Sequence, residues 1–178
     1  LVGASGLNAS VRDNKNTRPS LIMDDLNSFA HNALNKNLEE NKINDGMDMA
    51  LISIEKNKEK LKFAGAYNPL YIVRNNELAV YKGDRFAIGS YKPGEKQFKD
   101  NEITLEKNDM VYMFSDGFVD QFGGPKEKKF MSKNFRKLLI DIHQKPVAKQ
   151  KEVLNEKFMS WKGNLEQMDD VLVIGIRI

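Results

Sequence analysis

The chain has 178 residues, with 28 Lys and Arg against 25 Asp and Glu, and a formal net charge of +3. Hydrophobic residues make up 40% of the chain and charged residues 30%, a balance that buries a core and excludes a disordered protein. The basic residues are scattered along the chain, so we expect no nucleic-acid partner. The absence of cysteine excludes disulfides, thiolate metal sites and a cysteine nucleophile, and it favours a cytoplasmic location. No apolar run approaches the roughly 20 residues that a membrane span requires.

The first half of the chain predicts helices followed by strands. Residues 1–11 are small and mildly apolar, which is typical of a buried helix, and apolar residues at helical spacing predict an amphipathic helix from Pro19 to near Leu38. From Gly46 the pattern changes to short apolar or alternating runs separated by turn-forming residues, which predicts an antiparallel meander of hairpins. These runs are 47–55, 60–66, 69–75 and 77–83.

The second half returns to helices before a last strand. Strands are expected at 102–109 and, fully buried, at 111–114; helices are expected at 131–143 and 146–161, and a final strand at 171–178. The order of helices, strands, helices and strand predicts an α+β protein with antiparallel sheet covered by helices. The length favours a single domain over residues 1–178.

Carboxylates are concentrated at two points where a strand meets a loop. Asp116 follows the strand 111–114, and Asp169 and Asp170 precede the strand 171–178. If these strands are antiparallel neighbours, Asp116 and Asp169 converge at one rim of the sheet. Convergent carboxylates in a partly dry site either share a proton or hold a cation, and oxygen ligands without His or Cys favour Mg²⁺ or Mn²⁺. The structural alternative is that each acidic segment is only a turn or the guard of a sheet edge.

Taken together, the two acidic segments resemble a known pair of signatures. FSDGFVD at 114–120 and QMDDVLV at 167–173, with helices between them, are similar to the C-terminal signatures of the metal-dependent serine/threonine protein phosphatases (PPM), and more narrowly to their SpoIIE-like branch. DGMDMAL at 45–51, FAGAYNPLY at 63–71 and DRFAIG at 84–89 follow the order and spacing of the same branch.

The resemblance implies an antiparallel β-sandwich flanked by helices. It also implies two Mn²⁺ or Mg²⁺ ions in the intact domain, which activate a water that attacks phosphoserine or phosphothreonine. Asp116 and Asp169 become metal ligands, and Asp170 and Gly117 stand beside them, with Asp170 orienting the neighbouring ligand. The implied substrate is a phosphorylated regulatory protein, such as an anti-sigma-factor antagonist.

The chain departs from the family in one motif. Family members carry an Asp followed by Gly-His-Gly before their first helix, where it helps to bind both metals, and this chain has no such motif. We therefore expect the domain to be N-terminally truncated, with Leu1 lying just past the motif and two strands missing. Such a truncation exposes sheet edges, so we expect the fragment to self-associate, most simply as a two-fold dimer.

Two other classes of function remain to be weighed. A non-catalytic interaction module would keep the fold without the metals, but the presence of both Asp116 and Asp169 favours the enzyme. A nucleotide-binding fold is disfavoured because no Gly-rich loop joins a strand to a helix. His31 and His143 have no partner pattern, and we expect surface or capping roles for them.

Overall fold

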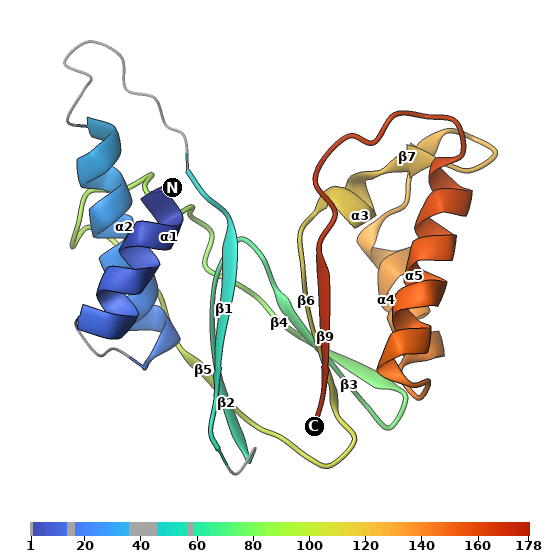
Figure 1. Ribbon diagram of the computed structural model, residues 1–178, viewed down its shortest axis with the longest axis horizontal. Coiled ribbons are helices and arrows are strands. Elements are labelled where there is room, and N and C mark those ends of the chain that lie inside the picture. Colours follow the sequence, from blue (N-terminus) through green and yellow to red (C-terminus); the bar gives the residue numbers. More distant parts are fainter. Residues whose placement is uncertain (1, 14–16, 36–45, 57–58) are drawn as a thin grey trace. The chain divides into compact units, whose positions relative to one another are not determined.

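The computed structural model describes residues 2–13, 17–35, 46–56 and 59–178 (Figure 1). These residues form two compact units, the first comprising Leu1–Leu70 and Tyr81–Leu105 and the second comprising Tyr71–Val80 and Glu106–Ile178. Each unit contains helices and one larger antiparallel sheet. The predicted α+β class with antiparallel sheets is therefore confirmed.

Unit 1 is a three-stranded sheet with helices from the start of the chain. Its sheet has the order β1-β2-β5, and both pairs of neighbouring strands are antiparallel. Its elements are α1 (Val2–Asn8), a π-helix (Ala9–Asp13), α2 (Pro19–Asn35), β1 (Met49–Ile54), β2 (Lys60–Ala66) and β5 (Asn101–Thr104). The predicted start of the second helix at Pro19 is confirmed, and its predicted end near Leu38 lies outside the described residues.

The two N-terminal helices approach closely because α1 carries a glycine at the contact. A Cβ placed on Gly6 would lie 2.6 Å from Cδ1 of Leu26 in α2. The beginning of α2 is capped by an aspartate distant in sequence: Asp100 accepts hydrogen bonds from the Ser20 amide at 2.8 Å and from Arg18 Nε at 3.0 Å. Such a carboxylate satisfies backbone N–H groups that have no partner within the helix.

Unit 2 contains a four-stranded antiparallel sheet of order β4-β3-β6-β9. Three helices and a two-stranded ribbon complete the unit. Its strands and helices are β3 (Leu70–Arg74), β4 (Glu77–Tyr81), β6 (Met110–Phe114), α3 (Gly117–Asp120), β7 (Phe122–Gly123), β8 (Lys128–Lys129), α4 (Ser132–Ile142), α5 (Val147–Lys162) and β9 (Val173–Arg177).

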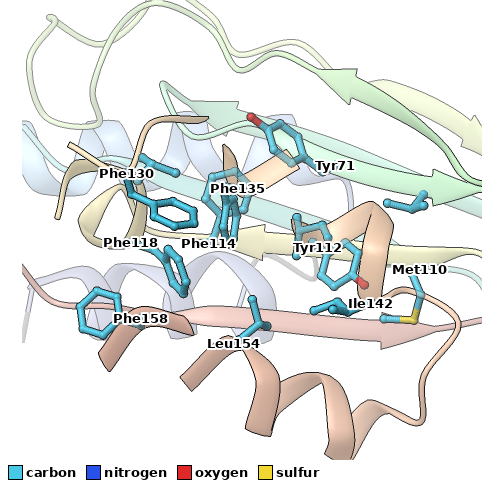
Figure 2. Packing of buried hydrophobic residues seen from close by; sticks show 13 residues of the cluster. Tyr71, Met110, Tyr112, Phe114, Phe118, Phe130, Phe135, Ile142, Leu154 and Phe158 are labelled. Carbon is cyan, nitrogen blue, oxygen red and sulfur yellow. The ribbon is translucent and has the colours of Figure 1, made fainter. Parts of the chain in front are cut away.

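An aromatic core holds the end of β6 in place (Figure 2). The ring of Phe118 in α3 lies 4.8 Å from that of Phe135 in α4 and 5.2 Å from that of Phe158 in α5. Phe114, the last residue of β6, lies 4.8 Å from Phe135 by the same measure. Because Phe114 and Phe118 flank the segment 115–117, burial of both rings fixes the backbone of that segment.

The first four strands do not form one sheet, so the predicted antiparallel meander is wrong. The β1–β2 hairpin forms, but β2 pairs on its other side with β5, whereas β3 pairs with β4 and β6. The chain leaves the first sheet after Ala66: Tyr67 has a positive φ of 57° and Pro69 has no N–H for a ladder. The turn between β3 and β4 has positive φ at both Asn75 (49°) and Asn76 (63°), as expected of a tight hairpin turn.

Candidate metal site

The site is built on the pairing of β6 with β9, which run side by side in Figure 1. Phe114 at the end of β6 lies opposite Val173 at the beginning of β9, and the Ser115 amide extends the ladder by donating to the Leu172 carbonyl at 3.0 Å. The antiparallel pairing on which the convergence of Asp116 and Asp169 depends is therefore present. It brings the segment around Asp116 beside the segment that carries Asp169.

Ser115 ties these two segments together. Its Oγ donates a hydrogen bond to the carbonyl oxygen of Asp170 at 2.7 Å and accepts one from the Leu172 amide at 2.9 Å. Gly117 also lies against the second segment, because a Cβ placed on it would be 3.2 Å from the carbonyl oxygen of Asp169. Gly117 was predicted from the sequence, whereas Ser115 was missed; the position of Ser115 directly before Asp116 was the available signal.

All three aspartates are exposed at this rim. Asp116 occupies the N-cap position of α3, but its side chain makes no capping hydrogen bond. Asp169 Oδ1 accepts the amide of Asp170 at 2.6 Å, which leaves its other oxygen available. Within the described ranges, no hydrogen bond or ion pair engages the carboxylate of Asp116 or Asp170. The carboxylates at this rim can therefore accept a cation without giving up a structural role.

The oxygen ligands at this rim are of the type that a hard cation binds, but they are few. Carboxylates and nearby backbone carbonyls are the oxygen ligands that Mg²⁺ and Mn²⁺ prefer. In the part of the chain that the structure describes, no three acidic or histidine side chains gather closely enough to hold a metal ion. Asp116 and Asp169 alone would leave most of a coordination sphere to water.

Gln121 is a further residue at this end of the sheet that the sequence analysis did not find. It follows α3 directly, its side chain is fully buried, and it donates a hydrogen bond to the carbonyl of Glu166 at 2.8 Å. Nothing in the local sequence singles it out, because Asp120 and Gln121 are both polar and both lie between the apolar Val119 and Phe122.

A cavity of about 530 Å³ lies in unit 2 between α5 and β9. Its lining is mostly apolar and includes Tyr112, Leu154, Phe158 and Val171, but none of the three aspartates. An apolar hollow does not suit a doubly charged phosphate group. The cavity is therefore a feature separate from the exposed acidic rim.

His143 lies elsewhere in unit 2. It is 5% exposed, and its Nδ1 is 2.6 Å from the carbonyl oxygen of Ile140 in the last turn of α4. Because a carbonyl only accepts, the ring nitrogen is the donor in this contact. The expected capping role is confirmed, whereas the alternative of a surface position is wrong for His143.

Comparison with known families identifies the chain. The sequence profile of the Stage II sporulation protein E (SpoIIE) family matches residues 5–178. This chain belongs to the SpoIIE family. A search of curated protein sequences finds no match.

Solved structures share the fold of this SpoIIE family member. The SiaA-PP2C domain of Pseudomonas aeruginosa has a TM-score of 0.87 at 24% identity, over 99% of this chain and 68% of that one. The PP2C phosphatase domain with a regulatory-domain fragment of SpoIIE from Bacillus subtilis has a TM-score of 0.71 at 15% identity, over 99% of this chain and 48% of that one. The catalytic domain of the serine/threonine phosphatase PstP, in complex with two manganese ions, has a TM-score of 0.63 at 17% identity, over 98% of this chain and 77% of that one.

These similarities show that the chain has the fold of PP2C-type phosphatase domains. The chain spans about two thirds of the SiaA domain (68%) and about half of the SpoIIE chain (48%). Among the described residues, none of the helices combines the length and apolar character needed to cross a bilayer.

Proposed function

We propose that residues 1–178 are part of one metal-dependent protein serine/threonine phosphatase domain in which Asp116 and Asp169 are metal ligands. The observation that carries this proposal is the β6–β9 pairing, which places the two acidic segments side by side with Ser115 bonded between them. Membership of the SpoIIE family supports it. The shared fold with a phosphatase domain that holds two manganese ions supports Mn²⁺ or Mg²⁺ as the cofactor.

The residues of the chain prepare the site for such an ion. When bound, Mn²⁺ or Mg²⁺ supplies Lewis acidity toward the phosphoryl oxygens and acidifies water. Asp116 and Asp169 provide negatively charged oxygen ligands on two different strand ends. Ser115 and Gly117 fix the backbone around Asp170, so the ligands need little rearrangement before they bind. Asp170 lies next to Asp169 and orients it through its amide.

The substrate class that suits this rim is a phosphoserine or phosphothreonine on another protein. All three aspartates are exposed, so a phosphate group carried on a protein surface can reach them. We propose a cytoplasmic regulatory phosphoprotein, such as an anti-sigma-factor antagonist, as the substrate. The family resemblance and the absence of cysteine support this choice.

The test is hydrolysis of a phosphopeptide and of p-nitrophenyl phosphate by the full-length protein. Activity should require Mn²⁺ or Mg²⁺ and should fall by at least about 100-fold in Asp169→Ala. Asp141→Ala, an exposed aspartate on α4, is the matched control and should keep full activity. Turnover that resists a chelator would contradict the mechanism. Loss of activity in Asp170→Ala but not in Asp169→Ala would show that Asp170 is the metal ligand and that Asp169 only supports it.

The alternative is a protein-interaction module that keeps the fold without catalysis. It would be favoured if the full-length protein lacked Gly-His-Gly, the motif that the family resemblance associates with both metals and that is absent from these 178 residues. The same assay separates the two functions, because an interaction module would bind a phosphoprotein without releasing phosphate at any Mn²⁺ concentration.

A further inference from the structure

The loop between α5 and β9, residues 163–172, carries Asp169 and is anchored to the segment after α3. Just before the loop, at the end of α5, Trp161 Nε1 donates to the carbonyl of Gln121 at 3.0 Å, and the Gly124 amide donates to the carbonyl of Trp161 at 2.8 Å. At the end of the loop, Ser115 Oγ binds the backbone of Asp170 and Leu172. The middle of the loop is held by the side chain of Gln121.

The side-chain amide of Gln121 uses both its donor and its acceptor groups. Its Nε2 donates to the carbonyl of Glu166 at 2.8 Å and to that of Phe122 at 3.0 Å. Its Oε1 accepts the amide of Met168 at 3.3 Å. The side chain therefore holds the backbone on both sides of Gln167, directly before Asp169.

Burial makes these hydrogen bonds important for the loop. Gln121 is 0% exposed, so water cannot replace its contacts, and a lost partner leaves a buried carbonyl or amide unsatisfied. Glu166 and Met168 are themselves exposed, which means that their side chains contribute little packing to hold the loop. The amide of Gln121 supplies that restraint instead.

We propose that Gln121 is a positioning residue for the metal ligand Asp169. By fixing the backbone at residues 166 and 168, it limits where the carboxylate of Asp169 can lie relative to Asp116. The inference rests on the proposed metal site. Only a Gln side chain is long enough and has both the donors and the acceptor to make these three hydrogen bonds. Glu lacks the donors, Asn is one methylene shorter, and Met offers no N–H donor and no amide oxygen.

The test compares Gln121→Met with a matched change at Gln150. Gln150 is a second buried glutamine of unit 2, 2% exposed, and it too binds two backbone carbonyls, those of His143 and Lys145. Its Oε1 accepts the hydroxyl of Tyr112. Gln150→Met therefore removes the same kind of buried amide without touching the loop that carries Asp169.

The first measurement is backbone hydrogen exchange of the metal-free 178-residue chain, followed by NMR. In Gln121→Met, the amides of Met168 and Asp170 should exchange at least about tenfold faster than in the wild type, the equivalent of one lost hydrogen bond. In Gln150→Met, they should exchange as in the wild type. Unchanged exchange at Met168 and Asp170 in Gln121→Met would overturn the inference.

The second measurement is Mn²⁺ affinity by calorimetry. Gln121→Met should bind about tenfold more weakly, the loss typical of a residue that supports a ligand, and Gln150→Met should bind as the wild type does. If Gln121→Met does not fold, Gln121→Glu, which keeps the volume and one acceptor, takes its place. If neither Gln121 variant folds while Gln150→Met does, Gln121 is needed for the stability of the whole unit. That result would overturn the inference.

Asp169→Asn separates this inference from the proposed function. If Asp169→Asn binds Mn²⁺ as tightly as the wild type, the metal role of Asp169 is wrong and the proposal for its positioning falls with it. If Asp169→Asn binds weakly and Gln121→Met binds normally, the metal site stands and only the role of Gln121 is wrong.

Discussion

Gly117 lies so close to Asp170 that no side chain fits between them. A Cβ placed on Gly117 would be 2.5 Å from the carbonyl oxygen of Asp170 and 3.0 Å from its carbonyl carbon. The obstacle is backbone on a segment that Ser115 also holds, so it cannot move aside as the end of a flexible side chain would. The close contact explains why a glycine follows Asp116.

Gly117→Ala should therefore push the loop of Asp169 away from α3. We expect a loss of about 1–3 kcal/mol in the free energy of unfolding, as for other overpacked sites, together with weaker Mn²⁺ binding. Thermal unfolding and calorimetry measure the two effects. Gly3→Ala is the control, because a Cβ there would meet Met47 Sδ at an ordinary 3.4 Å. Equal stability of Gly117→Ala and the wild type would show that the loop moves freely.

Asp116→Asn should weaken Mn²⁺ binding by the 178-residue chain. Two carboxylate anchors leave most of the coordination sphere to water, so we expect weak binding in the wild type and weaker binding once one charge is removed. Titration calorimetry checks this, with Asp141→Asn as the control for a loss of charge at an exposed site. Equal affinity of the wild type and Asp116→Asn would remove Asp116 from the site.

Asp100 should make the stability of unit 1 depend on pH. Burial acts to raise the pKa of Asp100, but hydrogen bonds from Ser20 and Arg18 outweigh it and hold that pKa below its usual value of 3.8. A lowered folded pKa contributes stability that is present above the usual value and is lost as the pH falls through the lowered one.

Asp100→Asn should accordingly cost about 1 kcal/mol at neutral pH, the scale of a helix cap. The difference from the wild type should shrink as the pH falls below about 4. Urea unfolding at a series of pH values measures it. A difference that stays constant down to the most acidic pH at which the chain folds would contradict the assignment.

The chain should self-associate through β9. This strand pairs with β6 on one side, and no described strand pairs with its other side. Leu172 and Ile174 are 57% and 40% exposed, and Arg177 is the only charge in the segment 171–178, so the edge lacks the charges that usually protect such strands. The simplest product is a two-fold dimer of two copies of the chain.

Light scattering over a range of concentrations measures this association. Ile174→Lys should shift the chain toward the monomer, because a charge at a strand edge opposes pairing. Met159→Lys adds the same charge at an exposed position of α5 and should leave the association unchanged. A folded wild-type monomer at every concentration would show that the edge of β9 is not an interface.

The hydrophobic pattern of the sequence was sufficient to predict most elements and the acidic rim. The apolar run before Ser115 is β6 and the run after Asp170 contains β9. In β6 the apolar residues are needed because the strand is buried, whereas β9 is apolar but only partly buried. The acidic residues at their ends could be recognised because a carboxylate next to an apolar run stands out against its surroundings.

Only the tertiary structure decided which strands pair and what holds the rim together. The runs of β2 and β3 are adjacent in sequence and both predict strands, yet they pair in different sheets, since pairing depends on contacts between residues that are distant along the chain. For the same reason the sequence could not reveal which backbone groups Ser115 and Gln121 hold. Each bonds to backbone atoms more than 40 residues away, and a hydrogen bond to a backbone carbonyl leaves no mark on the identity of the residue that accepts it.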